Sequence, residues 1–118
     1  MRKRPRFRIK TYFPLTAHIR QSKSKFHQLV TVGEGGFGFY GSTKDAELVK
    51  MRRIDLTLVL GSKKYELPAS VQYCTFIQQE KRLVNFFGVK FEDIDPKVEH
   101  LLKSLIESGL QKGHLIPA

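Results

Sequence analysis

The chain has 118 residues, of which 41% are hydrophobic and 27% charged, and its formal net charge is +10 at pH 7. This length suits one domain with a single core, and the apolar content excludes a chain that is disordered throughout. The excess of positive charge favours a polyanionic partner, because it raises the local concentration of phosphates and other anions.

The first ten residues form a basic arm. Arginine or lysine occupies six of these positions, so much of the positive charge is concentrated in one short segment. Arginine suits the recognition of anions and of the N7/O6 edge of guanine, since its planar fork can donate two parallel hydrogen bonds. A basic tail of this kind can also be a solvated terminus without a ligand.

Strand patterns follow the arm. Apolar and polar residues alternate from Tyr12 to Ile19, which is typical of a half-buried strand. Similar patterns, separated by short polar turns, predict five more strands at residues 26–32, 37–40, 54–60, 65–73 and 83–91. Because no long helix intervenes, we expect a mainly β fold, a six-stranded antiparallel β-barrel. We interpret residues 41–50 as a loop or a short helical turn.

Between the second and third strands lies the glycine-rich segment from Val32 to Gly38. Glycine lets a ligand, or the arm itself, approach the backbone closely. The alternative is a tight turn with no ligand at all.

The last part of the chain changes to a helical period. Apolar residues recur at helical spacing from Val98 to Ile106, and they predict a helix over residues 96–108 that packs on the barrel. Asp95 is the expected N-cap, Pro96 the first helical residue and Gly109 the left-handed C-terminal cap. Nothing obvious in the sequence holds the residues after 111.

Neither cysteine usage nor hydropathy points to export or to a membrane. Cys74 is the only cysteine, so no disulfide can form within the chain and a cytoplasmic location is expected. We expect no signal peptide, because no apolar stretch follows the basic arm, and no apolar run approaches the roughly 20 residues of a membrane span.

Two segments of the chain form a recognisable set. The arm, Arg2-Lys3-Arg4-Pro5-Arg6, fits an Arg-x-x-x-Arg pattern before the first strand. Phe87-Gly88-Val89-Lys90-Phe91 fits a closing strand of the Gly-Val-x-Phe type that leads to a helix. These segments resemble those of PilZ domains, the bacterial receptors for cyclic di-GMP. The resemblance covers nearly the whole chain and implies a PilZ-like split barrel, with residues 1–11 as a ligand clamp and residues 12–118 as the domain.

The middle motif of that family, Asp/Asn-x-Ser-x-x-Gly, is altered here. Thr31 and Gly33 occupy the first two positions, and Gly36 matches the third. The resemblance implies a cyclic di-GMP site with the following residues: Arg2, Arg4, Arg6, Thr31, Gly33 and Gly36. Arg2 and Arg6 would donate to guanine and phosphate, while Arg4 would extend the positive field.

The altered motif predicts weaker binding. Thr31 can replace one lost polar side chain, whereas Gly33 offers at most its backbone N–H to a phosphate. Each missing hydrogen bond to a charged group is worth about 1.5–3 kcal/mol, so we expect a loss of roughly tenfold to a hundredfold against a complete motif. On this hypothesis, replacing Gly33 by Ser should raise the affinity.

No enzyme chemistry is indicated. The four histidines lack metal-ligand spacing, and no catalytic triad or phosphate-loop pattern is present, so we predict no metal and no cofactor. The leading interpretation is a non-enzymatic receptor that changes its interaction surface on binding cyclic di-GMP and signals to a protein partner, for example in motility or secretion machinery. A degenerate PilZ-like adaptor without nucleotide is the alternative. A nucleic-acid-binding barrel is less favoured, and a steep salt dependence of binding would reveal it.

Overall fold

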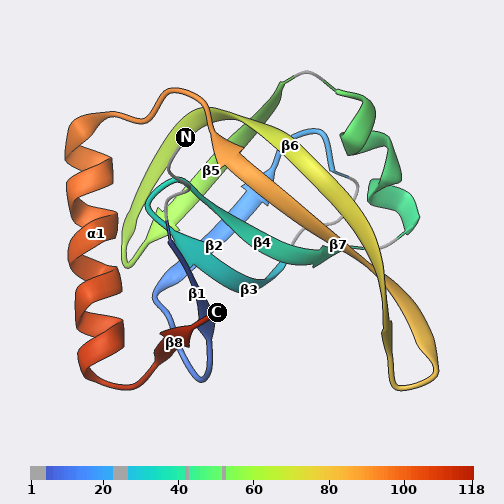
Figure 1. Cartoon of the computed structure of the whole chain (residues 1–118). Helices are drawn as coiled ribbons and strands as arrows, with labels where there is room; N and C mark the ends of the chain where they lie inside the picture. Colours follow the sequence, from blue (N-terminus) through green and yellow to red (C-terminus); the bar gives the residue numbers. More distant parts are fainter. Residues whose placement is uncertain (1–4, 23–26, 42, 52) are drawn as a thin grey trace.

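The computed structural model describes residues 5–22, 27–41, 43–51 and 53–118. These residues form eight β-strands, a 3₁₀ helix and an α-helix (Figure 1). The elements are β1 (Arg6–Ile9), β2 (Leu15–Ile19), β3 (Gln28–Gly33), β4 (Gly36–Gly41), η1 (Thr43–Lys50), β5 (Ile54–Leu60), β6 (Lys63–Gln79), β7 (Arg82–Phe91), α1 (Pro96–Gln111) and β8 (Leu115–Pro117).

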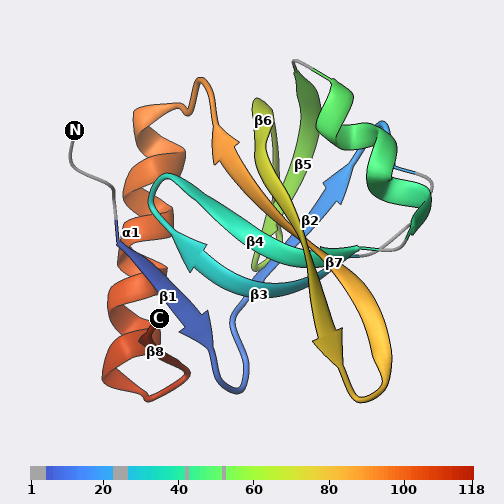
Figure 2. The same ribbon diagram turned by 45° about the vertical axis from the view of Figure 1, so that its right-hand side comes forward.

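All eight strands belong to one curled antiparallel sheet, in the order β2-β5-β6-β7-β4-β3-β1-β8 (Figures 1 and 2). The expectation of a mainly β, antiparallel fold with a C-terminal helix is confirmed. The expectation of six strands in a barrel is wrong, because the described residues form eight strands in a half-barrel whose hydrogen-bonded order ends at β2 and β8.

The two additional strands come from the ends of the chain. In β1, Phe7 and Ile9 pack against the core, while Arg8 between them is exposed. This is a strand period of two, but the density of arginine led to its interpretation as an arm. β8 pairs with β1 through Ile9 and Leu115, and its three residues are too few to give a pattern in the sequence. The residues after 111 are therefore held by the sheet.

The β6–β7 hairpin is longer than predicted. Its turn consists of Glu80 and Lys81, whose φ angles of 51° and 74° are both positive, as a two-residue hairpin turn of the primed type requires. The polar residues around the turn had suggested a wider loop. The hairpin projects beyond the rest of the sheet at the lower right of Figure 1.

The core lies on the concave side of the sheet. β5 shows the clearest alternation, with four apolar residues pointing inward between Ile54 and Leu60. Phe37, Phe39 and Phe87 are fully buried at its centre. The rings of Phe39 and Phe87 stack with centroids 5.0 Å apart and an interplanar angle of 12°.

The helix α1 begins as expected but ends later. The Asp95 carboxylate accepts a hydrogen bond of 2.7 Å from the backbone N–H of Lys97, and Pro96 opens the helix. The prediction of a helix that ends at residue 108 is wrong, because Gly109 lies inside the helix and not at its cap. A Cβ on Gly109 would lie 2.9 Å from Cγ of Leu115, so glycine is needed there for close packing. Gly113, with φ of 75°, supplies the left-handed residue beyond the end.

No helix in the described part of the chain combines the length and the apolar character needed to cross a bilayer.

A buried histidine makes the stability sensitive to acid. His27 is 7% exposed, its ring lies 4.4 Å from that of Phe39, and its Nε2 atom has no hydrogen-bond partner among the described residues. Burial lowers the pKa of His27 from 6.5, with His18 acting in the same direction and Asp45 opposing it.

The folded state disfavours the protonated ring. The part of the stability that depends on neutral His27 is therefore fully present above about pH 6.5 and is lost as the pH drops below it. We expect the urea midpoint to decrease between pH 7.5 and pH 5. In the variant His27→Gln, which cannot protonate at this position, the decrease should be smaller. An equal decrease in both proteins would show that other groups control the acid sensitivity.

Candidate functional site

Four of the six residues proposed from the sequence are described by the structure, and the sheet brings them together. Arg6 begins β1, Thr31 and Gly33 lie on β3, and Gly36 begins β4. Arg2 and Arg4 lie outside the described residues. The strand order β1-β3-β4 makes the three segments direct neighbours.

Strand register defines which residues share the outer, convex face. Paired residues on neighbouring strands point to the same side of a sheet. The candidate residues point outward, because their neighbours along each strand point into the core. One row across the outer face consists of Arg6, Gly33, Gly36 and Lys90. The next row consists of Arg8, Thr31, Gly38, Gly88 and Tyr73. We call the four glycines of these two rows, Gly33, Gly36, Gly38 and Gly88, the glycine patch.

The guanidinium of Arg6 lies across the glycine patch. Its Nη2 atom donates a hydrogen bond of 3.0 Å to the backbone carbonyl of Val89 on β7. A Cβ on Gly36 would lie 2.8 Å from this Nη2 atom and would collide with the same carbonyl oxygen. Glycine at position 36 is therefore what allows the arginine to reach across β4.

Gly33 is likewise in contact with the arm. It is buried, and a Cβ at this position would lie 2.5 Å from the carbonyl oxygen of Pro5 and 3.1 Å from Cδ of Arg6. The expected gain from Gly33→Ser is therefore offset by a clash, because the arm would have to move to admit any side chain. This exchange no longer tests the altered motif cleanly.

Thr31 faces the glycine patch from β3, where it pairs with Arg8 on one side and Gly38 on the other. Its hydroxyl oxygen lies 2.5 Å from the position that a Cβ on Gly38 would occupy. The half-buried threonine is therefore placed to offer one hydroxyl group at the edge of the patch.

Positive side chains surround this neutral surface. Arg8 and Lys90 are exposed, and each shares a row with the glycine patch. Burial lowers the pKa of Arg6, and Tyr73 opposes this change. Arginine nevertheless remains charged in proteins, so the patch is a flat surface bordered by cations, which suits an anionic ligand.

An aromatic row, not found from the sequence, continues the patch towards the β6–β7 hairpin. It consists of Tyr73, Phe86 and Tyr40. The ring of Tyr73 lies against Gly88, and that of Phe86 against Gly38, where an added Cβ would be 2.6 Å from the Phe86 Cζ atom. These residues come from three strands, so their proximity becomes visible only once the register is known. The signal that could have revealed this row is the pairing of an aromatic residue on one strand with a glycine on the next, where the ring covers the glycine.

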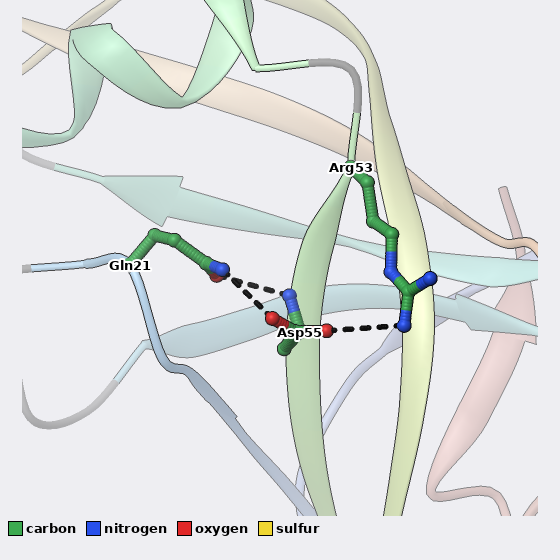
Figure 3. Close-up of polar contacts among 3 residues, drawn as sticks. All are labelled: Gln21, Arg53 and Asp55. Atoms are coloured by element: carbon green, nitrogen blue, oxygen red, sulfur yellow. Dashed lines mark hydrogen bonds and ion pairs between the residues drawn. The ribbon is translucent and has the colours of Figure 1, made fainter.

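A hollow of about 390 Å³ lies elsewhere, over β2, β5 and β6, and Arg53 and Asp55 are among its lining residues. Gln21 and Asp55 exchange two hydrogen bonds of 2.9 Å, and Arg53 lies 3.5 Å from the same carboxylate (Figure 3). Arg53 is thus paired with an acidic neighbour and is not part of the glycine patch.

The described residues have the fold of a PilZ domain. The solved structures that resemble this chain include the cyclic di-GMP complex of MrkH from K. pneumonia, with a TM-score of 0.79, 12% identity, and coverage of 96% of this chain and 54% of MrkH. The PilZ domain of YcgR from Escherichia coli with cyclic di-GMP has a TM-score of 0.68 and 18% identity, with 95% of this chain and 96% of that domain covered.

The Bacillus subtilis motility inhibitor MotI (DgrA) is also similar, with a TM-score of 0.65, 17% identity, and coverage of 95% of this chain and 53% of MotI. The chain spans about half the length of MrkH and of MotI. Neither a protein-family model nor a curated protein sequence matches this chain.

Proposed function

We propose that this chain is a non-enzymatic receptor for cyclic di-GMP, with the nucleotide bound on the outer face of β1, β3 and β4. The observation that carries the proposal is the position of Arg6, whose guanidinium lies across the glycine patch and is bonded to Val89. The similarity in fold to MrkH and to YcgR, each solved with cyclic di-GMP, supports the same ligand.

In this proposal charged and neutral side chains make different contacts with the nucleotide. Arg6 and Arg2 donate to guanine edges and to phosphate oxygens, and Arg4 extends the positive field. Arg8 and Lys90 add positive charge at the borders of the patch. Thr31 supplies one neutral hydrogen bond, and the close contact of Gly33 with Pro5 leaves no room there for a second side-chain donor.

The signal would pass through residues 1–11 as a ligand clamp. β1 is already paired with β3 and β8, so we place the ligand-dependent change in the contacts of the Arg6 guanidinium. A change there alters the surface presented to a protein partner, such as motility or secretion machinery, in the bacterial cytoplasm.

Titration calorimetry with cyclic di-GMP tests the proposal. We expect saturable binding, and a tenfold to hundredfold loss of affinity in Arg6→Ala, because a hydrogen bond to a charged group is worth about 1.5–3 kcal/mol. Arg53→Ala is the matched control. It removes the same charge from an exposed arginine that pairs with Asp55 on another part of the sheet, so its affinity should match that of the unchanged protein.

Other results would contradict the proposal. Equal losses in Arg6→Ala and Arg53→Ala would mean that only the overall charge matters, and a steep decrease of binding with salt would then point to nucleic acid. An absence of binding to the unchanged protein would favour the adaptor without nucleotide. The observation in favour of that second function is that neither Thr31 nor Gly33 carries the acidic or serine side chain of the resembling motif.

A further inference from the structure

The aromatic row of Tyr73, Phe86 and Tyr40 is an apolar feature beside the glycine patch. Tyr73 is 48% exposed, although its ring lies against Gly88. The Tyr73 and Phe86 rings are 6.2 Å apart with an interplanar angle of 31°, and Tyr40 meets Phe86 edge to face at 5.7 Å. Phe86 and Tyr40 are half-buried. Tyr73 therefore presents ring surface to solvent and is supported from behind and from the side.

The row is next to the cationic part of the site. Tyr73 and Arg6 lie on adjacent rows of the outer face. Lys90 lies between them in the sheet, opposite Gly36. A ligand with a flat aromatic ring and a phosphate could therefore contact Tyr73 and the basic side chains at the same time.

Hydrogen bonds to the base would come from other side chains of the site. One of the five N–H groups of Arg6 is used by the Val89 carbonyl, and the others can donate to the O6 and N7 atoms of a guanine. Thr31 adds one hydroxyl, which can donate to one base or accept from the other.

We propose that Tyr73, supported by Phe86, is a stacking surface for one purine of a cyclic dinucleotide, and that this contact contributes affinity without selecting guanine over adenine. This inference rests on the proposed function for the presence of two phosphates in the ligand. Every base presents an aromatic face, so stacking supplies affinity without selecting the base.

The experiment compares cyclic di-GMP with cyclic di-AMP on the unchanged protein and on three variants. Tyr73→Ala should lose about tenfold or more in affinity for both ligands, as is typical of one stacked base. Tyr73→Phe, which retains the ring, should retain the affinity. Tyr12→Ala is the matched control, because Tyr12 is 66% exposed and contacts His114 instead of the patch. The factor lost in Tyr73→Ala should agree between the two ligands to within about threefold, because stacking does not select the base.

A second measurement separates this inference from the proposed function. The ring NMR signals of Tyr73 and Tyr12 are followed during titration with GMP and with AMP, each of which carries one purine and one phosphate. A shift at Tyr73 with both nucleotides, and none at Tyr12, supports the stacking surface even if neither cyclic dinucleotide binds, in which case only the proposed function fails.

Three results would overturn the inference. The first is unchanged affinity for cyclic di-GMP in Tyr73→Ala, which leaves the proposed function intact. The second is a loss in Tyr73→Ala that differs by more than about tenfold between the two cyclic dinucleotides, which would mean that Tyr73 selects the base. The third is the absence of any shift at Tyr73 with GMP and AMP together with no binding of either cyclic dinucleotide, which rejects both proposals.

Discussion

Replacing Phe87 by Ala should lower the free energy of unfolding by about 3–5 kcal/mol. Phe87 is fully buried on β7, and its ring stacks on that of Phe39. The exchange removes most of a large apolar side chain and leaves a cavity between rigid strands. Because small domains are stable by only about 5–15 kcal/mol, this loss is a large share of the total. Urea unfolding followed by circular dichroism measures it.

Phe76→Ala is the control for this prediction. Phe76 is the same residue type on the neighbouring strand β6, but it is 72% exposed. Its removal should change the free energy of unfolding by no more than about 0.5 kcal/mol. Similar losses in the two variants would mean that the projecting hairpin is packed as tightly as the core, contrary to the burial described above.

The second large effect is expected at Gly36. The exchange Gly36→Ala should destabilise the protein by about 3 kcal/mol, because the new Cβ would collide with the Val89 carbonyl of the neighbouring strand. The backbone is fixed by pairing with β3 on one side and β7 on the other, so the collision cannot be relieved by a side-chain rotation. The unfolding midpoint in urea or heat should show the loss.

Gly61→Ala separates this collision from the ordinary cost of replacing glycine. Gly61 has a φ of 64°, and no atom lies within 4 Å of its Cβ position, so only the left-handed backbone opposes the exchange. We expect a loss of about 1 kcal/mol there. If Gly36→Ala were no more destabilising than Gly61→Ala, the close approach of β4 and β7 at Val89 would be wrong.

The strands that could be predicted from the sequence are those with one face buried in the core. The start of the helix could be predicted because it depends on local residue preferences. β5 alternates without interruption, so burial on one side of the sheet determines its sequence. The helix start is fixed by Asp95 and Pro96, whose preferences act locally. β1 has the same alternation as β5, but its outward residues are arginines, and their charge hid a strand whose other face reaches the core.

The candidate site was predictable only in part for a related reason. The arm and the glycine turn are continuous segments, so a sequence motif can represent them. Tyr73, Phe86 and Lys90 join the site through pairing between strands that are distant in sequence. The prediction of Gly109 as the helix cap failed for a third reason, because glycine is needed there for close packing against Leu115, a residue outside its own helix.

The position of β1 between β3 and β8 has a consequence for the order of folding. Phe7 pairs with Val32 and also with Pro117, so the strand that carries Arg6 closes the longest loop in the described sheet. Contacts between residues far apart in sequence form slowly, because the chain must lose loop entropy before they are made. The hairpins and α1 can form from local contacts, whereas β1 gains its second neighbouring strand only when β8 reaches it. On a ribosome, a chain that has not yet released β8 would therefore hold the strand that carries Arg6 by one edge only.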